Sequence, residues 1–301
     1  MTPTLVRQHP HTGDKPRVDL SARARDWSEI QERMLVPLHE AVYERLDVGP
    51  GTRLLGLGCG SGLALLTAAA RGAETTGVEP SSPERLTLAR ERLRAETTGT
   101  HTRAGAPAVT ASLDGLDKLD GLGTMGTSGT PDAPGRRAGG YDIVTAFEPI
   151  GCRAGDSDDL ADLLTAAAAY AARGAAVVLA GWGPPERCAT STVLRVADKL
   201  ADPLHGAGRW RPALRDDLEE VAERAGLRPD GSGRVACPFG YADTDSAVRG
   251  LLSTGLFDAA ITATDPAQVD KEMREALHPY RRADRTVWMP NVFRYLIARV
   301  P

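Results

Sequence analysis

The stretch LLGLGCGSGLALL, residues 54–66, decides the fold that this sequence predicts. An apolar run without helical periodicity enters a glycine-rich turn, and an apolar, alanine-rich segment follows it as far as Gly72. A buried strand, a tight turn and a helix account for this order. The turn presents free backbone N–H groups at the start of the helix, and Gly58 and Gly60 let a ligand approach the backbone closely.

The segments that follow repeat the alternation of strand and helix. TTGVE at 75–79 predicts the second strand, and SSPERLTLARERL at 81–93 predicts a helix with a capping-box spacing at its start. We expect further strands at 100–105, 141–147, 175–182 and 292–300, with helices at 156–174, 190–201 and 213–225. This alternation predicts an α/β protein with a Rossmann-like, doubly wound sheet covered by helices on both faces.

Two segments before and inside this pattern have a different character. Residues 1–20 are polar and are expected to be disordered. Apolar residues recur every three or four positions over 21–48, which predicts a pair of lid helices separated near Pro37. Residues 107–140 are rich in Gly, Thr and Asp and are expected to form a flexible insertion.

Late in the chain, two helix-like regions have no place in the predicted sheet. Residues 183–212 and 238–285 are therefore assigned to a helical cap over a substrate, within a single domain that spans 21–301. The cap is moderately apolar, which favours an organic metabolite over a protein or nucleic acid as the partner.

Composition excludes several classes of protein. The chain has 301 residues, 42% of them hydrophobic, and a formal net charge of −4, so no basic surface suggests nucleic acid. No apolar run approaches the roughly 20 residues of a membrane-spanning helix. The four cysteines are widely spaced, which predicts reduced thiols in a cytoplasmic protein and no metal site.

An acid follows the second strand, at Glu79, about 20 residues after the glycine turn. At this point an acid accepts hydrogen bonds from a ribose diol, so turn and acid together imply an adenosine-containing ligand. A dinucleotide turn requires G-x-G-x-x-G, whereas this turn reads G-x-G-x-G over Gly58, Gly60 and Gly62. A nicotinamide-dependent oxidoreductase therefore remains the less favoured alternative.

Several quoted motifs, in this order, resemble class I S-adenosylmethionine-dependent methyltransferases, specifically the bacterial small-molecule type known as methyltransferase type 11-like. GTRLLGLGCGSGLALLTAAARGAETTGVEPS resembles their first motif and ribose acid, and GYDIVTAFEPIGC, GAAVVLAGWGPPERC and NVFRYLIARV resemble their fourth, fifth and last strands. DWSEIQERMLVPLHEAVYERLDV is similar to their N-terminal helical lid. The resemblance implies a seven-stranded sheet with an antiparallel last strand and S-adenosylmethionine as the cofactor.

The resemblance also implies the residues of the site. Those expected at the cofactor are Gly56, Gly58, Cys59, Gly60, Gly62, Glu79, Pro80 and Phe147. Those expected at the substrate are Trp27, Glu148, Trp182 and Tyr241, although the helical spacing of Trp27 favours a place in the hydrophobic core. Candidate catalytic residues are Glu148, His205 and His278, with structural roles open for each.

Two departures from the family pattern concern the cofactor. The family usually carries an acid at the position of Gly56, where it helps to hold the methionine part, and Ala106 stands near the place of a polar residue that meets the adenine. Loss of a charge-assisted hydrogen bond weakens binding by roughly 1.5–3 kcal/mol.

The sequence as a whole predicts methyl transfer to a small organic metabolite by a monomer or homodimer, without nucleic acid or membrane partners. The alternative is a protein of the same fold that has lost methyl transfer or performs other chemistry.

Overall fold

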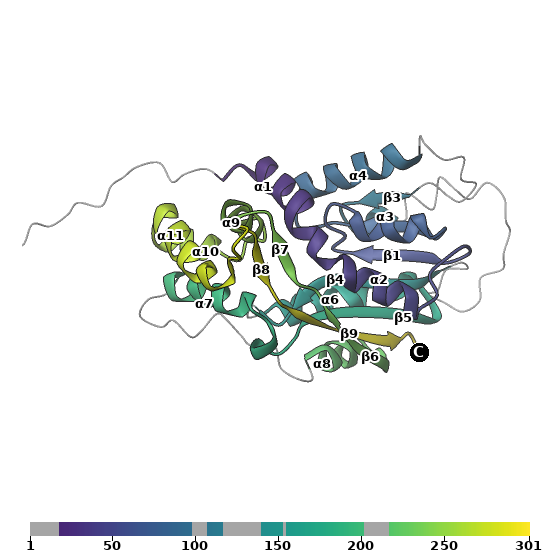
Figure 1. Cartoon of the computed structure of the whole chain (residues 1–301). Coiled ribbons are helices and arrows are strands. Elements are labelled where there is room, and N and C mark those ends of the chain that lie inside the picture. The colour runs from purple at the N-terminus through teal and green to yellow at the C-terminus, as the bar shows by residue number, and fades with distance from the viewer. Residues whose placement is uncertain (1–17, 98–106, 117–139, 153–154, 202–216) are drawn as a thin grey trace, which may run out of the picture.

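The computed structural model describes residues 18–97, 107–116, 140–152, 155–201 and 217–301, and a seven-stranded sheet forms its centre (Figure 1). The strand order is β3–β2–β1–β4–β5–β9–β6. β9 runs antiparallel to both of its neighbours, β5 and β6, whereas the other neighbouring strands pair in parallel. Their bounds are β1 Arg53–Leu57, β2 Glu74–Val78, β3 Ala108–Thr110, β4 Tyr141–Ile150, β5 Ala171–Trp182, β6 Arg228–Ala236 and β9 Val292–Arg299. The predicted doubly wound sheet with an antiparallel last strand is confirmed.

Helices cover both faces of the sheet. One apolar core joins the sheet to α2 (Val36–Arg45), α3 (Leu63–Ala70) and α4 (Pro83–Thr97), and a second joins it to α6 (Asp156–Ala167) and α8 (Asp217–Arg224). Successive residues of β5 alternate between the two, because Val178 packs in the first core and Leu179 in the second. Burial on both faces explains why this strand reads as an uninterrupted apolar run.

The lid lies over the glycine turn and is irregular where it does so. α1 (Leu20–Asp26) leads into a π turn at Trp27–Gln31 and a 3-10 turn at Glu32–Leu35 before α2 begins. Pro37 lies in the first turn of α2, where its missing N–H costs no hydrogen bond. The predicted division of the lid near Pro37 is therefore observed, and its irregular part carries the residues that meet the turn.

The cap gathers at one end of the sheet (Figure 1). It consists of α7 (Thr190–Ala201), α9 (Thr244–Leu252), α10 (Asp258–Ala263) and α11 (Pro266–Leu277), with a hairpin of β7 (Phe239–Tyr241) and β8 (Val287–Met289). α10 and α11 pack on α7. Phe257, just before α10, and Met273 in α11 are fully buried. Short 3-10 turns occur at Ala168–Tyr170, Pro185–Arg187 and His278–Tyr280.

Two strands differ from the sequence-based expectation. The third strand is at 108–110, inside the segment expected to be an insertion, and the expected strand at 100–105 lies outside the described residues. β6 was not predicted, because its sequence RPDGSGRVA resembles a loop. Gly233 explains part of this composition, since a Cβ there would lie 2.4 Å from the Tyr295 hydroxyl on β9.

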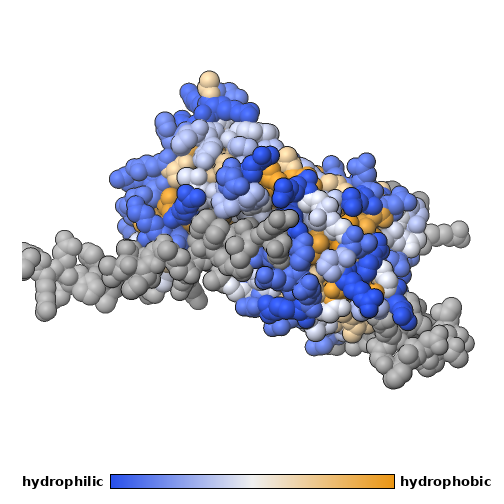
Figure 2. Space-filling model, turned by 90° about the horizontal axis from the view of Figure 1, so that it is seen from below, coloured by the Kyte–Doolittle hydropathy of each residue, from blue (hydrophilic) through white to orange (hydrophobic). Residues whose placement is uncertain are grey.

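The exposed surface carries few large apolar side chains. On the face shown in Figure 2, apolar residues form small patches separated by polar side chains. Among the residues that the structure describes, the exposed large hydrophobic side chains are Val18, Leu20 and Trp288. No helix in the described ranges is both long and apolar enough to cross a membrane.

Candidate functional site

The glycine turn between β1 and α3 adopts a conformation that favours glycine. Gly58 and Gly60 have φ of +57° and +58°, in the left-handed region that side chains disfavour. The Cys59 N–H donates to the Val78 carbonyl at 3.0 Å, which fixes the turn to β2. Gly62 also has a left-handed φ, of +84°, and a Cβ there would lie 3.2 Å from Ala89 on α4. All three glycines are thus favoured by the backbone of the turn, and Gly62 by helix packing as well.

Glu79, at the end of β2, is a buried carboxylate that organises the turn. Glu79 is only 2% exposed, and its Oε2 accepts a hydrogen bond from the Gly60 N–H at 2.8 Å. Its Oε1 accepts from the backbone N–H groups of Ser81 and Ser82 at 2.9 and 3.2 Å, and from the Ser81 hydroxyl. The sequence therefore placed its acid correctly at the edge of the turn.

A second carboxylate, Glu32, reaches the turn from the lid. Glu32 is 4% exposed, and its Oε1 accepts from the Ser61 N–H at 2.9 Å. Its Oε2 accepts from the Ser61 hydroxyl and from Arg92 Nη1, which forms a salt bridge at 2.8 Å. Arg92 also donates to the Ser28 hydroxyl at 2.6 Å. The lid is thereby attached to the N-terminal end of α3, where the helix dipole favours a negative charge.

Two buried polar atoms beside the turn have no hydrogen-bond partner within the described structure: Trp27 Nε1 and His39 Nδ1. Their residues are 8% and 2% exposed. The Arg85 guanidinium lies 4.0 Å from the centre of the Trp27 ring and donates to the Ser253 carbonyl at 3.1 Å. The His39 ring lies 4.7 Å from that of Phe147. Burial lowers the pKa of His39 to about 3, so its imidazole is neutral.

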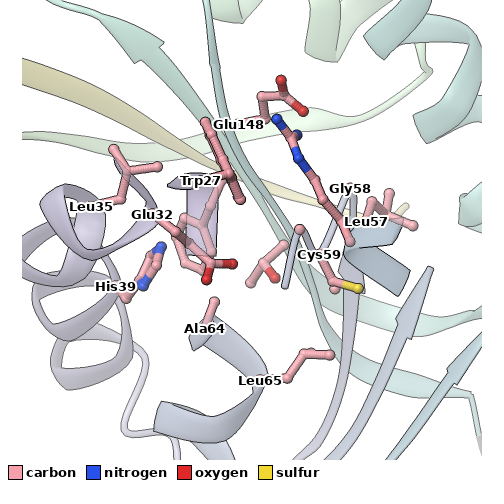
Figure 3. A pocket seen from close by; sticks show the side chains of 15 residues that line it. Trp27, Glu32, Leu35, His39, Leu57, Gly58, Cys59, Ala64, Leu65 and Glu148 are labelled. Carbon is pink, nitrogen blue, oxygen red and sulfur yellow. The ribbon is translucent and has the colours of Figure 1, made fainter. Parts of the chain in front are cut away.

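A cleft of about 350 Å³ opens at the carboxyl ends of β1 and β4, between the lid and the cap. A smaller recess of about 30 Å³ lies under the lid, lined by Trp27, Glu32 and His39 among others (Figure 3). The residues that line both spaces are Trp27, Leu35, Leu57, Gly58 and Glu148. The recess is therefore the inner end of the cleft, next to the glycine turn.

The outer end of the cleft is lined by aromatic rings. Trp182 lies 4.7 Å from Phe293 and 6.0 Å from Phe239, measured between ring centres. Carboxylates of Glu148, Asp156 and Asp159 also line the cleft, and no Lys, Arg or His does so among the described lining residues. The described lining at this end of the cleft is therefore mostly apolar, and its charged side chains are negative.

Comparison with known proteins rests on structure, because no family model and no curated protein matches the sequence. YcgJ of Bacillus subtilis is similar at 13% identity and a TM-score of 0.50, over 87% of this chain and 97% of that one. The cyclopropane synthase MmaA2 of Mycobacterium tuberculosis is similar at 14% identity and a TM-score of 0.49, over 94% of this chain and 94% of that one. YjhP of E. coli is similar at 19% identity and a TM-score of 0.48, over 93% of this chain and 99% of that one. The order of the seven strands and the antiparallel β9 agree with the fold expected from the resemblance to class I S-adenosylmethionine-dependent methyltransferases. At these identities the similarity establishes the fold alone.

Gly56 shows what replaces the acid that class I methyltransferases usually carry. A Cβ at Gly56 would lie 2.8 Å from Leu65 Cδ2, and one at Gly77, its partner on β2, would lie 2.4 Å from Leu65 Cδ1. The two glycines thus accommodate the Leu65 side chain between α3 and the sheet. In this chain an apolar contact therefore occupies the space beside Gly56.

The structure brings most of the residues implied by the resemblance together. Gly56, Gly58, Cys59, Gly60 and Phe147 line the recess, and Trp27, Glu148 and Trp182 line the cleft.

Other members of that set lie elsewhere. Pro80 is exposed after β2, and Tyr241 is buried behind the cleft, where its hydroxyl donates to Gln31 Oε1 at 3.0 Å. His278 is exposed and is not among the cleft-lining residues. His205 and Ala106 lie outside the described residues.

Cys59 is the cysteine of the glycine turn, and its thiol is poorly reactive. Burial raises the pKa of its thiol, and the carboxylates of Glu79 and Glu32 raise that pKa further. A protonated thiol is a poor nucleophile, so Cys59 serves the turn through its backbone.

Sequence reasoning missed Glu32 and Arg85. Each was visible as a polar residue within a helix that buries apolar neighbours, but the partners that make it significant come from other elements. Glu32 meets Ser61, 29 positions away, and Arg85 meets Ser253, 168 positions away.

Proposed function

We propose that this protein binds S-adenosylmethionine at the carboxyl ends of β1 and β2 and transfers its methyl group to a small organic molecule in the cleft. The observation that carries this proposal is the meeting of three features at one edge of the sheet. They are the left-handed glycine turn, the buried carboxylate of Glu79 and a cleft of about 350 Å³ between lid and cap. Ligands of doubly wound sheets bind at this edge.

The residues present suit the cofactor. Glu79 would hold the ribose hydroxyls, and Gly58 is open, since a Cβ there would meet nothing closer than Glu148 Oε2 at 3.8 Å. A carboxylate offers about four lone-pair sites, and four donors already occupy those of Glu79, so a ribose hydroxyl would displace the Ser81 hydroxyl. The unpartnered Trp27 Nε1 and His39 Nδ1 provide buried polar atoms that a ligand would satisfy.

When bound, the cofactor supplies an electrophilic methyl group on a sulfonium centre. The chain's task is to align the acceptor and exclude water, since orientation supplies most of the acceleration. Trp27 and Leu35 of the lid cover the inner cleft. Glu148, at the end of β4, is placed to contact the acceptor and to take a proton from an acceptor that loses one.

The lining of the cleft favours particular acceptors. The aromatic wall of Trp182, Phe239 and Phe293 suits an apolar or aromatic body. The charged side chains described at the outer end of the cleft are carboxylates. They disfavour an anionic acceptor relative to a neutral or amine-bearing one. A screen for acceptors should begin with neutral and amine-bearing organic molecules.

Calorimetric titration with S-adenosylmethionine, S-adenosylhomocysteine and NAD tests the proposal. We expect micromolar binding of the two adenosyl ligands and none of NAD. The Glu79→Gln variant should lose about tenfold or more in affinity, because a charged acceptor is removed, whereas Glu74→Gln, at the exposed start of β2, should not.

Failure of both adenosyl ligands to bind wild-type protein would overturn the proposal. Binding without methyl transfer to any acceptor in the screen would instead support a protein of this fold that has lost the reaction.

A further inference from the structure

A second hollow, here named the outer groove, lies beside the cap where β8 meets the start of α7. Its volume is about 910 Å³, and its walls include Tyr280, the exposed Trp288 and the 3-10 turn Pro185–Arg187. Ligand sites typically have volumes of about 300–1,000 Å³ and aromatic walls, so the groove has the size and lining of one. Among the described lining residues, none is shared with the cleft.

A small space, here named the neck, lies between the cleft and the outer groove. Its lining shares Cys152 and Trp182 with the cleft. It shares Pro185, Cys188 and Ser191 with the outer groove. The volume of the neck is about 10 Å³, which is the room of about one water-sized group. Cleft, neck and outer groove therefore follow one another in a series that starts beside the proposed reacting end.

The two ends of this series differ in charge. The charged side chains in the described lining of the cleft are three carboxylates, as noted above. The outer groove is lined instead by two guanidinium groups, those of Arg187 and Arg195, and by one carboxylate, that of Glu186. Guanidinium groups form charge-assisted, often bidentate hydrogen bonds with carboxylates and phosphates. The groove therefore favours an anionic group that the cleft disfavours.

The neck restricts the shape of any molecule that reaches both ends. Rings and branched chains are much wider than a single water-sized group, whereas an unbranched methylene chain has the smallest cross-section of common organic bodies. The neck also offers apolar contacts, because Trp182, Pro185 and Leu194 line it. Burial of each methylene group against such side chains is favourable. An unbranched apolar chain is thus the body that suits the neck.

We propose that the acceptor is an elongated, amphipathic molecule that occupies all three spaces. Its neutral or amine-bearing reacting end lies in the cleft, its unbranched chain passes the neck, and its anionic far end lies in the outer groove at Arg187 and Arg195. The inference rests on the proposed function and names the class of its acceptor. It gives Ser191 and Trp182 the part of selecting an unbranched chain.

Unmodified protein tests the proposal with two matched series of probes. They are unbranched ω-amino carboxylates of about four to fourteen carbons and the alkylamines of the same lengths, titrated calorimetrically into the full chain without cofactor. A short probe keeps its carboxylate within the cleft, so it should bind at least about threefold more weakly than its amine. A long probe carries its carboxylate to the outer groove, so it should bind at least about fivefold more tightly than its amine.

Two substitutions locate the effect. Arg195→Gln should remove most of the gain that the carboxylate gives to long probes and should leave the alkylamines unchanged, whereas Arg90→Gln, exposed on α4, should change neither series. Ser191→Leu adds bulk in the neck, so its carboxylate probes should bind more weakly than the amines at every length. Unchanged affinity for S-adenosylhomocysteine would show that each variant is folded.

The sign of the carboxylate effect decides the outcome. A penalty at every length in wild-type protein, a gain that Arg195→Gln does not reduce, or no binding of any probe would overturn the proposal. With S-adenosylhomocysteine still bound, any of these results would leave the proposed function standing. Failure of the adenosyl ligands would remove the proposed function, and the probe titrations, made without cofactor, report on the three spaces separately.

Discussion

The two ends of the cleft are built on different principles. At the inner end, buried polar atoms on the lid, Glu32, Trp27 and His39, face a turn whose backbone is fixed by Glu79. At the outer end, Trp182, Phe239 and Phe293 present rings with few fixed polar partners. Directional contacts suit a ligand that is always the same, whereas an apolar wall selects by size and shape. The contrast is what the proposed function requires of a cofactor end and an acceptor end.

Removing the lid carboxylate should break the inner end most strongly. Glu32→Ala leaves Arg92 and the Ser61 N–H without their buried partner, so we expect a loss of roughly 3 kcal/mol in the free energy of unfolding. Urea unfolding measures it. Glu29→Ala changes an exposed lid acid and should cost less than about 0.5 kcal/mol. Equal effects of the two substitutions would show that the lid does not depend on the Glu32 contact.

Acidification should weaken the inner end through His39. Burial lowers its pKa from 6.5 to about 3. Between pH 6.5 and pH 3 the imidazole is therefore protonated in the unfolded chain and neutral in the folded protein. Stability is therefore full above about pH 6.5 and falls as the pH drops toward 3, by about 2 kcal/mol between pH 7 and pH 5 from this residue.

Unfolding at the two pH values in wild-type protein and in His39→Phe isolates this contribution. The variant should lose about 2 kcal/mol less than wild type between pH 7 and pH 5, whereas His278→Phe, at an exposed position, should behave as wild type. If the free energy of unfolding of His39→Phe fell as much as that of wild type between pH 7 and pH 5, the His39 imidazole of the folded protein would be accessible to water.

Restoring the family's acid should harm the inner end. Gly56→Asp forces Leu65 Cδ2 away from a Cβ at 2.8 Å, and we expect a loss of about 1–2 kcal/mol in stability together with weaker S-adenosylhomocysteine binding. Adding Leu65→Ala to this variant should make the combined loss smaller than the sum of the two single losses. Strict additivity of the two substitutions, or tighter binding in Gly56→Asp, would contradict the packing account.

A change at the outer end should leave the inner end almost untouched. Trp182→Leu removes one ring of the aromatic wall, so its affinity for S-adenosylhomocysteine should stay within about twofold of wild type. The affinity for an acceptor should fall, which titration in the presence of S-adenosylhomocysteine measures. A large loss of cofactor affinity in this variant would erase the distinction between the two ends.

Sequence patterns predicted the parts of the molecule that depend on local order. The strand–turn–helix at 54–66 and Glu79 were identifiable because period, glycine spacing and chain separation are encoded within about 25 residues. β6 was not predicted, because its partners on β9 lie 56 to 71 positions further along the chain and its glycines resemble a loop. Glu32 was not predicted for the same reason, since its role depends on contacts with Ser61 and with Leu63 at the start of α3.

The hydrogen bond from the Tyr241 hydroxyl to Gln31 Oε1 joins the cap to the lid at a buried point. In the proposed function the cofactor touches the lid and the acceptor touches the cap, so ordering either element would lower the entropy that remains to be lost in ordering the other. By linkage, whatever factor the cofactor adds to the affinity for the acceptor, the acceptor must add to the affinity for the cofactor. The Tyr241–Gln31 contact, together with the Arg23–Asp258 and Arg249–Asp26 salt bridges, would thus couple the two proposed binding events without their ligands having to meet.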